Sequence, residues 1–352
     1  MLTSPNRSTS DSVASPTSIT DAPLLPPLVD GLGRVHRELR ISITDVCNIR
    51  CQYCMPEIVQ FLHREKHLGV EHIARFVQSV VPLGIRRIRI TGGEPLVRPD
   101  LPDLLRRLSD TAGVEELSLT TNGTLLEEQI DGLVAAGLQR LNISLDTLSE
   151  ARFQQLSRRQ GIDRVLRGIE AASGYPKLRV KLNALLLRDI NLDDAVALVE
   201  YARQREITIR FIEFMPLDGD RAWSQSRMVS GIELRQLLQQ HFGTLYPIER
   251  RDPSQPSSDY RFAAGGTVGF IDSVSNPFCS RCDRLRLTSD GKIRNCLFGR
   301  EEWDVSELLR SHAPLDLVQQ VVRSSVAAKH PSHGIANSGF QPPQRAMYQI
   351  GG

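Results

Sequence analysis

The sequence lacks an apolar run long enough to cross a bilayer, and its first 33 residues lack the apolar core of a signal peptide. It also lacks an excess of charge of either sign, because 43 Lys and Arg residues face 41 Asp and Glu residues, a formal net charge of +2. Such a balance gives no field that would draw the chain to nucleic acid or to a membrane surface. We therefore expect a soluble, cytoplasmic protein with neither of these partners.

The ends of the chain differ in composition from its middle. Residues 1–33 are rich in Ser, Pro and Thr, which is typical of a disordered extension. The total of 352 residues is long for one ordinary domain and suggests two. We place them at 34–222 and 223–352.

Cysteine is scarce, with six residues in the whole chain. In a cytoplasmic protein these six argue for metal or redox chemistry rather than for disulfides. Cys47, Cys51 and Cys54 share one short loop, and three thiolates would leave one iron of a four-iron cluster open to a small molecule. A zinc site completed by His63 or His67, or a disulfide knot, are the alternatives.

Between Arg34 and Met215, short β-rich runs alternate with stretches of helical period, which is typical of repeated βα units around a parallel sheet. The expected strands are Leu39–Ile43, Arg86–Ile90, Glu116–Thr120, Arg140–Ser144, Leu178–Leu182 and Ile207–Ile212. The expected helices are Val70–Val81, Asp100–Ser109, Leu125–Ala136, Ile162–Ala172 and Asn191–Gln204. Six units predict either a partial (β/α)6 TIM-type barrel or an open doubly wound sheet. The barrel is favoured because unusual residues follow the strands.

These residues stand at the carboxyl ends of the strands, where such folds build their sites. Thr91-Gly92-Gly93-Glu94-Pro95 combines two glycines, which let a ligand approach the backbone, with a carboxylate that can accept from an ammonium. Thr120 and Ser144 follow the next two strands in ordinary polar turns. Lys181 and Arg210 lie in the last two, where alternation can aim them into the barrel.

A second set of three thiols, Cys279, Cys282 and Cys296, lies in the expected C-terminal domain. Arg284 and Arg286 alternate with Leu285 just after it, so both guanidiniums fall on one side of an extended segment. Two guanidiniums beside an incompletely ligated metal suit a phosphorylated ligand. A zinc ribbon with solvated arginines is the alternative.

The Cys-x-x-x-Cys-x-x-Cys loop and the Gly-Gly-Glu-Pro turn together resemble the radical S-adenosylmethionine (SAM) enzymes. That resemblance implies a partial barrel and a [4Fe-4S] cluster whose open iron binds SAM. Tyr53, Gly93, Glu94, Ser144 and Met215 match its SAM-contacting positions.

With the second cysteine set, Arg210–Met215 and the terminal Gly351-Gly352, the chain resembles more closely the GTP 3′,8-cyclase family of molybdenum cofactor biosynthesis. This resemblance implies a second [4Fe-4S] cluster on Cys279, Cys282 and Cys296, and catalytic roles for Arg284, Arg286, Gly351 and Gly352. The residues that match GTP contacts are Arg40, Arg89, Thr120, Lys181, Arg210, Arg284, Leu285 and Arg286. Arg87 stands where the family often has lysine.

The resemblance also implies a mechanism and partners. SAM cleavage at the first cluster gives a 5′-deoxyadenosyl radical, which takes hydrogen from C3′ of GTP so that C3′ can bond to C8. The product is (8S)-3′,8-cyclo-7,8-dihydroguanosine 5′-triphosphate, made by a lyase. An electron donor is required, and cyclic pyranopterin monophosphate synthase receives the product. The oligomeric state is left open, with a homodimer as one alternative.

Three other functions fit parts of the sequence. A radical SAM enzyme with an auxiliary cluster could act on a peptide, but it would have less use for several phosphate-binding cations. A zinc-stabilised binding module would be colourless and is disfavoured for nucleic acid by the small net charge. A redox-sensing iron–sulfur regulator leaves the Gly-Gly-Glu-Pro turn unexplained.

Overall fold

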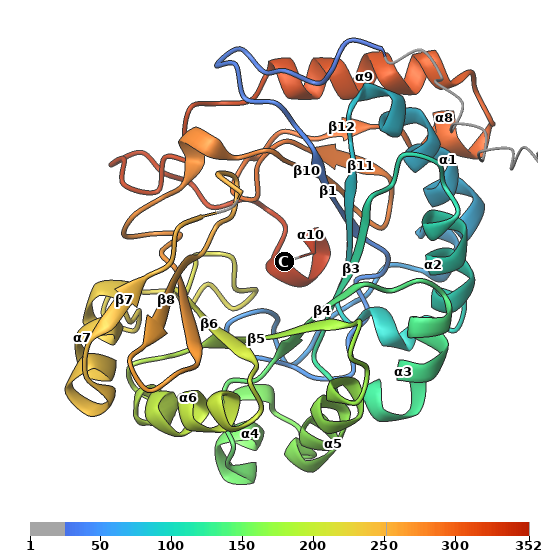
Figure 1. Cartoon of the computed structure of the whole chain (residues 1–352). Coiled ribbons are helices and arrows are strands. Elements are labelled where there is room, and N and C mark those ends of the chain that lie inside the picture. Colours follow the sequence, from blue (N-terminus) through green and yellow to red (C-terminus); the bar gives the residue numbers. More distant parts are fainter. Residues whose placement is uncertain (1–24, 251, 352) are drawn as a thin grey trace, which may run out of the picture.

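The sheet of this protein, a computed structural model that describes residues 25–250 and 252–351, curves around a central lumen (Figure 1). Its strand order is β12-β11-β10-β1-β2-β3-β4-β5-β6-β9-β8-β7. The strands are β1 (Glu38–Ser42), β2 (Arg87–Thr91), β3 (Glu116–Thr121), β4 (Arg140–Ser144), β5 (Arg179–Leu185), β6 (Thr208–Ile212), β7 (Leu245–Pro247), β8 (Ser258–Phe262), β9 (Thr267–Ile271), β10 (Arg284–Leu287), β11 (Lys292–Arg294) and β12 (Trp303–Asp304).

Helices line the outside of the parallel part of the sheet (Figure 1). They are α1 (Val70–Val80), α2 (Leu101–Ser109), α3 (Leu126–Ala135), α4 (Glu150–Ser157), α5 (Ile162–Ser173), α6 (Ala195–Gln204), α7 (Gly231–Phe242), α8 (Ser306–Arg310) and α9 (Leu315–Ala327). The short helix α10 (Met347–Ile350) lies inside the barrel instead (Figure 1). All six expected strands are confirmed to within a few residues, as are the five helices expected between them.

The core lies between the sheet and these helices. Alternate residues of β1 and β2, such as Leu39 and Ile88, are fully buried there, and α1 presents Ile73, Phe76 and Val77 to them at helical spacing. Because strand side chains alternate, the residues between these apolar positions face the lumen. The sequence period therefore sorts arginines to the inside of the barrel and aliphatic side chains to its outside.

The C-terminal part of the chain widens the sheet at both edges. β9 pairs in parallel with β6, and β10 pairs in parallel with β1. The boundary expected at 222/223 falls in the loop between β6 and α7, so chain from both sides of it contributes to one sheet. The division into 34–222 and 223–352 stays a prediction.

The N-terminal segment differs in part from the expected extension. Residues 1–24 lie outside the described residues, whereas 25–33 pack on the barrel. Leu28 is buried, and its N–H donates to the Leu83 carbonyl over 3.0 Å. Asp30 forms a buried ion pair with Arg34. Ordered packing thus begins before Arg34.

No helix in the described ranges combines the length and the apolar character needed to cross a membrane.

Candidate active site

A cavity of about 340 Å³ opens at the centre of the barrel, and both cysteine sets border it. Of the residues singled out in the sequence, those that line it are Arg40, Cys47, Cys51, Tyr53, Cys54, Arg89, Gly93, Thr120, Ser144, Arg210, Met215, Cys279, Cys282, Arg284, Arg286 and Cys296. These residues come from six strands and five loops, and the fold brings them to one space.

Two connections hold the first cysteine loop in place. The N–H groups of Arg50 and Gln52 donate to carbonyls at the end of α4, over 2.8 and 3.0 Å. On the other side, the N–H of Gly93 donates to the Thr44 carbonyl over 2.7 Å. A Cβ at Gly93 would lie 2.4 Å from the Val46 carbonyl oxygen, so this close approach requires glycine. The Gly-Gly-Glu-Pro turn therefore braces the cysteine loop as well as bordering the cavity.

The donor set fits iron–sulfur chemistry. All six cysteines are free and half-buried, which excludes the disulfide knot in this structure. Among the described residues, no three His, Cys, Asp or Glu side chains gather as they would around a single metal ion. The fit to clusters therefore rests on donor type, since three soft thiols stand on each side of the cavity and iron–sulfur clusters take thiolates.

Glu94 lies beneath the cavity rather than in its lining. Its carboxylate accepts from the N–H of Leu96 over 3.0 Å, from the Thr121 hydroxyl over 2.7 Å and from the N–H of Asn122 over 2.6 Å. Burial raises the pKa of Glu94 to about 7, although the three hydrogen bonds favour the carboxylate and act in the opposite direction. In this structure Glu94 joins the turns after β2 and β3, and its contact with SAM stays a prediction.

Tyr53 and Asp146 form a half-buried pair that lines the same cavity. The Tyr53 hydroxyl donates to the Asp146 carboxylate, which also accepts from the N–H of Leu185 over 2.8 Å. Burial raises the pKa of Asp146 to about 6. Sequence analysis did not single out Asp146, although its place shortly after the fourth strand, in the same polar turn as Ser144, was a signal for it.

Positive charge dominates the other end of the cavity. The cation set consists of Arg40, Arg89, Lys181, Arg210, Arg284 and Arg286. Burial, reinforced by the Arg210 charge, lowers the pKa of Lys181 to about 8. Burial also lowers the pKa of Arg89 to about 10, although Glu38 opposes this shift. Desolvated cations this close together favour an anionic ligand.

Two carboxylates pair with members of the cation set. Glu38 accepts from Arg40 Nε over 2.9 Å and lies 3.5 Å from Arg89 Nε, and Asp259 accepts from Arg210 over 2.9 Å. Burial disfavours the Glu38 carboxylate, but the neighbouring guanidiniums outweigh it and hold its pKa well below the ordinary value. Sequence analysis missed Glu38, although it lies two residues before Arg40 on the same strand face.

Three of the expected substrate or cofactor residues do not line the cavity. Leu285 is fully buried in the core on the outer side of β10, as its alternation with two arginines requires. Lys181 and Glu94 lie behind the lining. Arg87 is held by ion pairs with Asp252 and Asp283 and is also outside the lining.

Two cations, Arg284 and Lys329, lie beside Cys282 of the second cysteine set. The Lys329 ammonium donates to the Arg284 carbonyl over 2.9 Å and to Cys282 Sγ over 3.4 Å. Burial disfavours the Cys282 thiolate, but Arg284 and Lys329 outweigh it and lower the pKa of Cys282 to about 6. Sequence analysis did not identify Lys329, because this residue lies far along the chain from Cys282.

The C-terminal tail ends inside the barrel (Figure 1). Arg286 donates a hydrogen bond to the Gly351 carbonyl. Gly351 has a φ of +82°, and a Cβ there would lie 2.2 Å from the Thr91 hydroxyl oxygen, so the position requires glycine. Gly352 lies outside the described residues.

Two family models match consecutive parts of the chain: the Radical SAM superfamily over residues 41–202 and Molybdenum Cofactor Synthesis C over 207–335. A relative from Rhodopirellula baltica named GTP 3′,8-cyclase is 48% identical over 342 residues, 96% of this chain and 94% of the relative. A relative of the same name from Mycobacterium sp. (strain KMS) is 42% identical over 94% of this chain and 95% of its own length.

Solved structures with a similar fold include Streptococcus suis SuiB bound to precursor peptide SuiA. It matches 85% of this chain and 67% of its own with a TM-score of 0.58 at 15% identity. A structure of anSMEcpe with bound AdoMet matches 87% of this chain and 81% of its own with a TM-score of 0.55 at 14% identity. At such identity the likeness concerns the fold alone, and it agrees with the expected partial barrel.

Proposed function

This chain belongs to the GTP 3′,8-cyclase family within the radical SAM superfamily, and from that membership we propose that it converts GTP to (8S)-3′,8-cyclo-7,8-dihydroguanosine 5′-triphosphate. This reaction is the first step of molybdenum cofactor biosynthesis. The observation that carries the proposal is one cavity that both cysteine sets border and that Arg40, Arg89, Arg210, Arg284 and Arg286 line.

Three cysteines of the first loop hold the cluster that members of this superfamily use with SAM. We assign this role to Cys47, Cys51 and Cys54. Tyr53, Gly93, Ser144 and Met215 line the cavity near them and are the proposed SAM contacts. Glu94 fixes the turn that carries Gly93, through its bonds to the two neighbouring turns. When bound, the reduced cluster and SAM supply a 5′-deoxyadenosyl radical as hydrogen acceptor.

The cation set binds the triphosphate in this proposal. A triphosphate brings several negative charges, and charge-assisted bonds to guanidinium groups are among the strongest contacts available to it. Glu38 and Asp259 keep Arg40 and Arg210 oriented before the substrate arrives. Thr120 lines the same cavity. Cys279, Cys282 and Cys296 would hold the second cluster, which when bound would supply iron chemistry at the purine end of GTP.

Enclosure is the remaining contribution of the chain. A carbon radical would attack any nearby C–H bond, so the site must exclude water and stray groups. The barrel wall and Met347 of the C-terminal tail line the cavity. Loss of the C3′ hydrogen of GTP lets C3′ bond to C8, and a second electron with a proton completes the product. The enzyme is thereby a carbon–carbon bond-forming lyase.

The partners follow from the same membership. We propose an external electron donor for the clusters, and cyclic pyranopterin monophosphate synthase as the enzyme that receives the product. Division of the chain at 222/223 into a SAM-binding and a GTP-binding part belongs to the proposal, and assembly as a homodimer stays a prediction.

The test is anaerobic incubation of the reconstituted protein with GTP, SAM and a chemical reductant, followed by identification of the nucleotide product. We expect the cyclised triphosphate and 5′-deoxyadenosine in the wild type and neither in Cys51→Ala. Formation of 5′-deoxyadenosine without any altered nucleotide would contradict the proposal.

A further inference from the structure

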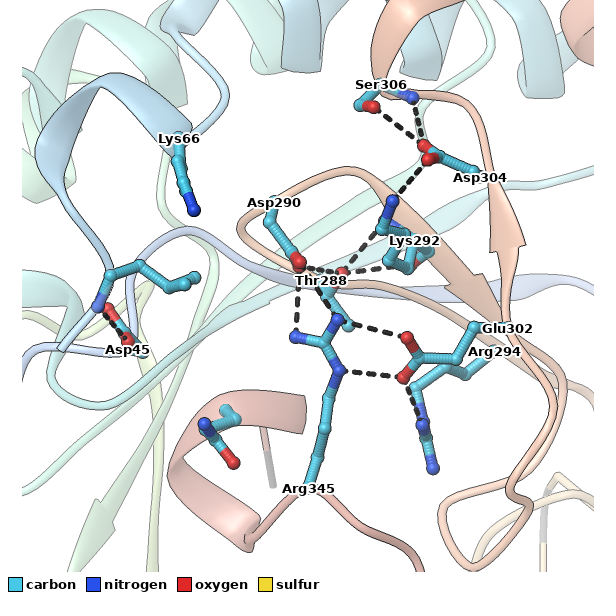
Figure 2. Close-up of polar contacts among 12 residues, drawn as sticks. Asp45, Lys66, Thr288, Asp290, Lys292, Arg294, Glu302, Asp304, Ser306 and Arg345 are labelled. Atoms are coloured by element: carbon cyan, nitrogen blue, oxygen red, sulfur yellow. Dashed lines mark hydrogen bonds and ion pairs between the residues drawn. The ribbon is translucent and has the colours of Figure 1, made fainter. Parts of the chain in front are cut away.

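The segment that leads into the C-terminal tail is fixed by one arginine. Arg345 directly precedes Ala346, the N-cap of α10, and Gly351 follows the last residue of this short helix. Figure 2 shows the Arg345 side chain pointing away from this helix and lying between Asp290 and Glu302. Neither the cysteine motifs nor the cation set includes this group.

The contacts of Arg345 use all its nitrogen donors. Nη1 and Nη2 donate to the two carboxylate oxygens of Asp290 over 3.1 and 2.9 Å. Nη2 also donates to Glu302 Oε2 over 3.0 Å, and Nε lies 2.7 Å from Glu302 Oε1. A guanidinium that contacts two carboxylates in this way fixes both the position and the orientation of the Arg345 side chain, which the single ammonium of a lysine cannot do.

The environment makes this network stronger than an exposed ion pair. The side chains of Arg345, Asp290 and Glu302 are 19%, 17% and 23% exposed. Glu302 pairs in addition with Arg294, whose side chain is 2% exposed. Isolated surface pairs contribute little, but bidentate, partly buried networks are the exception. The carboxylates are thus held in place before they meet Arg345.

The anchor and the active site share one hairpin. Asp290 lies at the turn between β10 and β11, β10 carries Arg286, and β11 leads to Cys296. The tail therefore touches this hairpin twice: Arg345 binds at its turn, and Gly351 accepts from Arg286 within its first strand. Tyr348 and Ile350, between these contacts, are buried. Apolar burial holds the tail without fixing how deeply it inserts, whereas its polar contacts do. These are the two contacts just named and the N–H of Met347, which donates to the Leu217 carbonyl over 2.9 Å.

We propose that Arg345 is a positioning residue, a latch that sets the depth of tail insertion and so keeps the Gly351 carbonyl on Arg286. The tail then orients a guanidinium of the cation set and closes the cavity. This inference rests on the proposed cyclase function for its catalytic consequence, but the latch itself is a property of the chain that can be measured without GTP.

The first experiment measures tail release. The reconstituted protein is treated with a carboxypeptidase, and removal of C-terminal residues is followed by mass spectrometry. We expect removal at least tenfold faster in Arg345→Gln and in Asp290→Asn than in the wild type. The double variant should be no faster than the faster single variant, because both remove the same contact. Arg300→Gln, which breaks an exposed contact to Gln341 in the same C-terminal segment, is the matched control and should behave as the wild type.

The second experiment measures coupling. The ratio of cyclised product to 5′-deoxyadenosine should fall at least tenfold in Arg345→Gln, while SAM cleavage continues and the iron and sulfide content is unchanged. A general loss of stability would lower both products together. Arg345→Lys keeps the positive charge but loses the bidentate contacts, so its product ratio should lie between those of the wild type and Arg345→Gln. If Arg345→Gln does not retain its clusters, the product ratio of Arg345→Lys decides whether Arg345 positions the tail.

The outcomes separate the two proposals. Faster release together with a lower product ratio supports the latch. A protected tail in Arg345→Gln, or a wild-type product ratio despite faster release, overturns it. If the wild type makes no cyclised product, the proposed function fails, and the carboxypeptidase result still decides whether Arg345 fixes the tail.

Discussion

At the scale of single residues, the charge around the cavity is decided by an excess of cations over carboxylates among buried and half-buried side chains. The cation set has six members, and Glu38 and Asp259 pair with three of them. Arg284 also lies over the ring of Phe278, 4.6 Å from its centroid. These contacts hold the guanidiniums apart and oriented, so that an anionic ligand meets a site that needs little rearrangement.

Replacing Arg284 or Arg286 by Ala should therefore weaken GTP binding far more than SAM binding. Loss of one partner from a buried charge contact costs about 2–5 kcal/mol, or roughly 30-fold or more in Kd. Calorimetric titration of the reconstituted protein with each ligand checks this. Arg167→Ala, on the exposed side of α5, is the control. An equal loss of both ligands would indicate misfolding instead of a specific contact.

The second prediction at this scale concerns Glu94, whose pKa is raised by burial from 4.5 to about 7. A carboxyl group that binds its proton more tightly when folded makes the folded state less stable as pH rises between these two values. The difference of about 2.5 pH units, at about 1.4 kcal/mol each, gives a loss of about 3 kcal/mol.

Urea unfolding of metal-free protein at pH 4.5 and pH 8 measures this loss. Glu94→Gln should show a decrease in unfolding free energy smaller than that of the wild type by about that amount. Glu128→Gln, on an exposed position of α3, is the control. The same pH dependence in Glu94→Gln as in the wild type would show that Glu94 does not cause it.

At the scale of elements, the β10–β11 hairpin connects most parts of the site. It bears Arg284 and Arg286 on one strand, leads to Cys296 after the other and receives the tail at its turn. The parallel pairing of β10 with β1 sets Arg286 beside Arg40, and β2 sets Arg89 on the other side. The spacing of the arginines is thus fixed by sheet register rather than by loops.

Cys296→Ala should remove the second cluster and stop cyclisation while SAM is still cleaved at the first, at least slowly. The reason is that the two cysteine sets lie in separate loops, and the first is braced by α4 and by the turn at Gly93. Iron and sulfide analysis should show about half of the wild-type content. An unchanged content would contradict the assignment of Cys296 as a ligand.

Deletion of Gly351-Gly352 should leave both clusters and SAM binding intact but stop cyclisation. The structural reason is that the Gly351 carbonyl accepts from Arg286 in a space that admits no Cβ. Product analysis of the truncated protein checks it, with a deletion of residues 1–10 as the control for shortening a terminus. Full cyclisation by the truncated protein would show that the last two glycines have no role in the reaction.

Sequence reasoning located the strands well because their apolar alternation decides which face is buried. The cysteines, the glycine turn and the arginines of β10 could also be found, because each forms a local pattern in the sequence. Glu38 could not, because an acid in a strand looks solvated until the guanidiniums of Arg40 on its own strand and of Arg89 on β2 are placed around it. Lys329 and Arg345 depend on contacts with residues far away in the chain, which no local period encodes.

At the scale of the whole molecule, the barrel joins the proposed SAM-binding part and the proposed GTP-binding part of the chain around one cavity. The strands added by the C-terminal part extend the same sheet at both edges, so the two cysteine sets have a rigid connection. The C-terminus enters the lumen and covers part of it (Figure 1). The central claim is that this geometry directs the radical chemistry to the ribose of GTP.

Transfer of deuterium tests that claim most directly. GTP labelled with deuterium at C3′ is incubated anaerobically with the reconstituted protein, SAM and reductant, and 5′-deoxyadenosine is analysed by mass spectrometry. The account predicts that label from C3′ appears in 5′-deoxyadenosine and that label from GTP deuterated at C8 does not. If 5′-deoxyadenosine accumulates in the presence of C3′-deuterated GTP but stays unlabelled, the cyclase mechanism proposed for this chain is contradicted, even if both clusters are present.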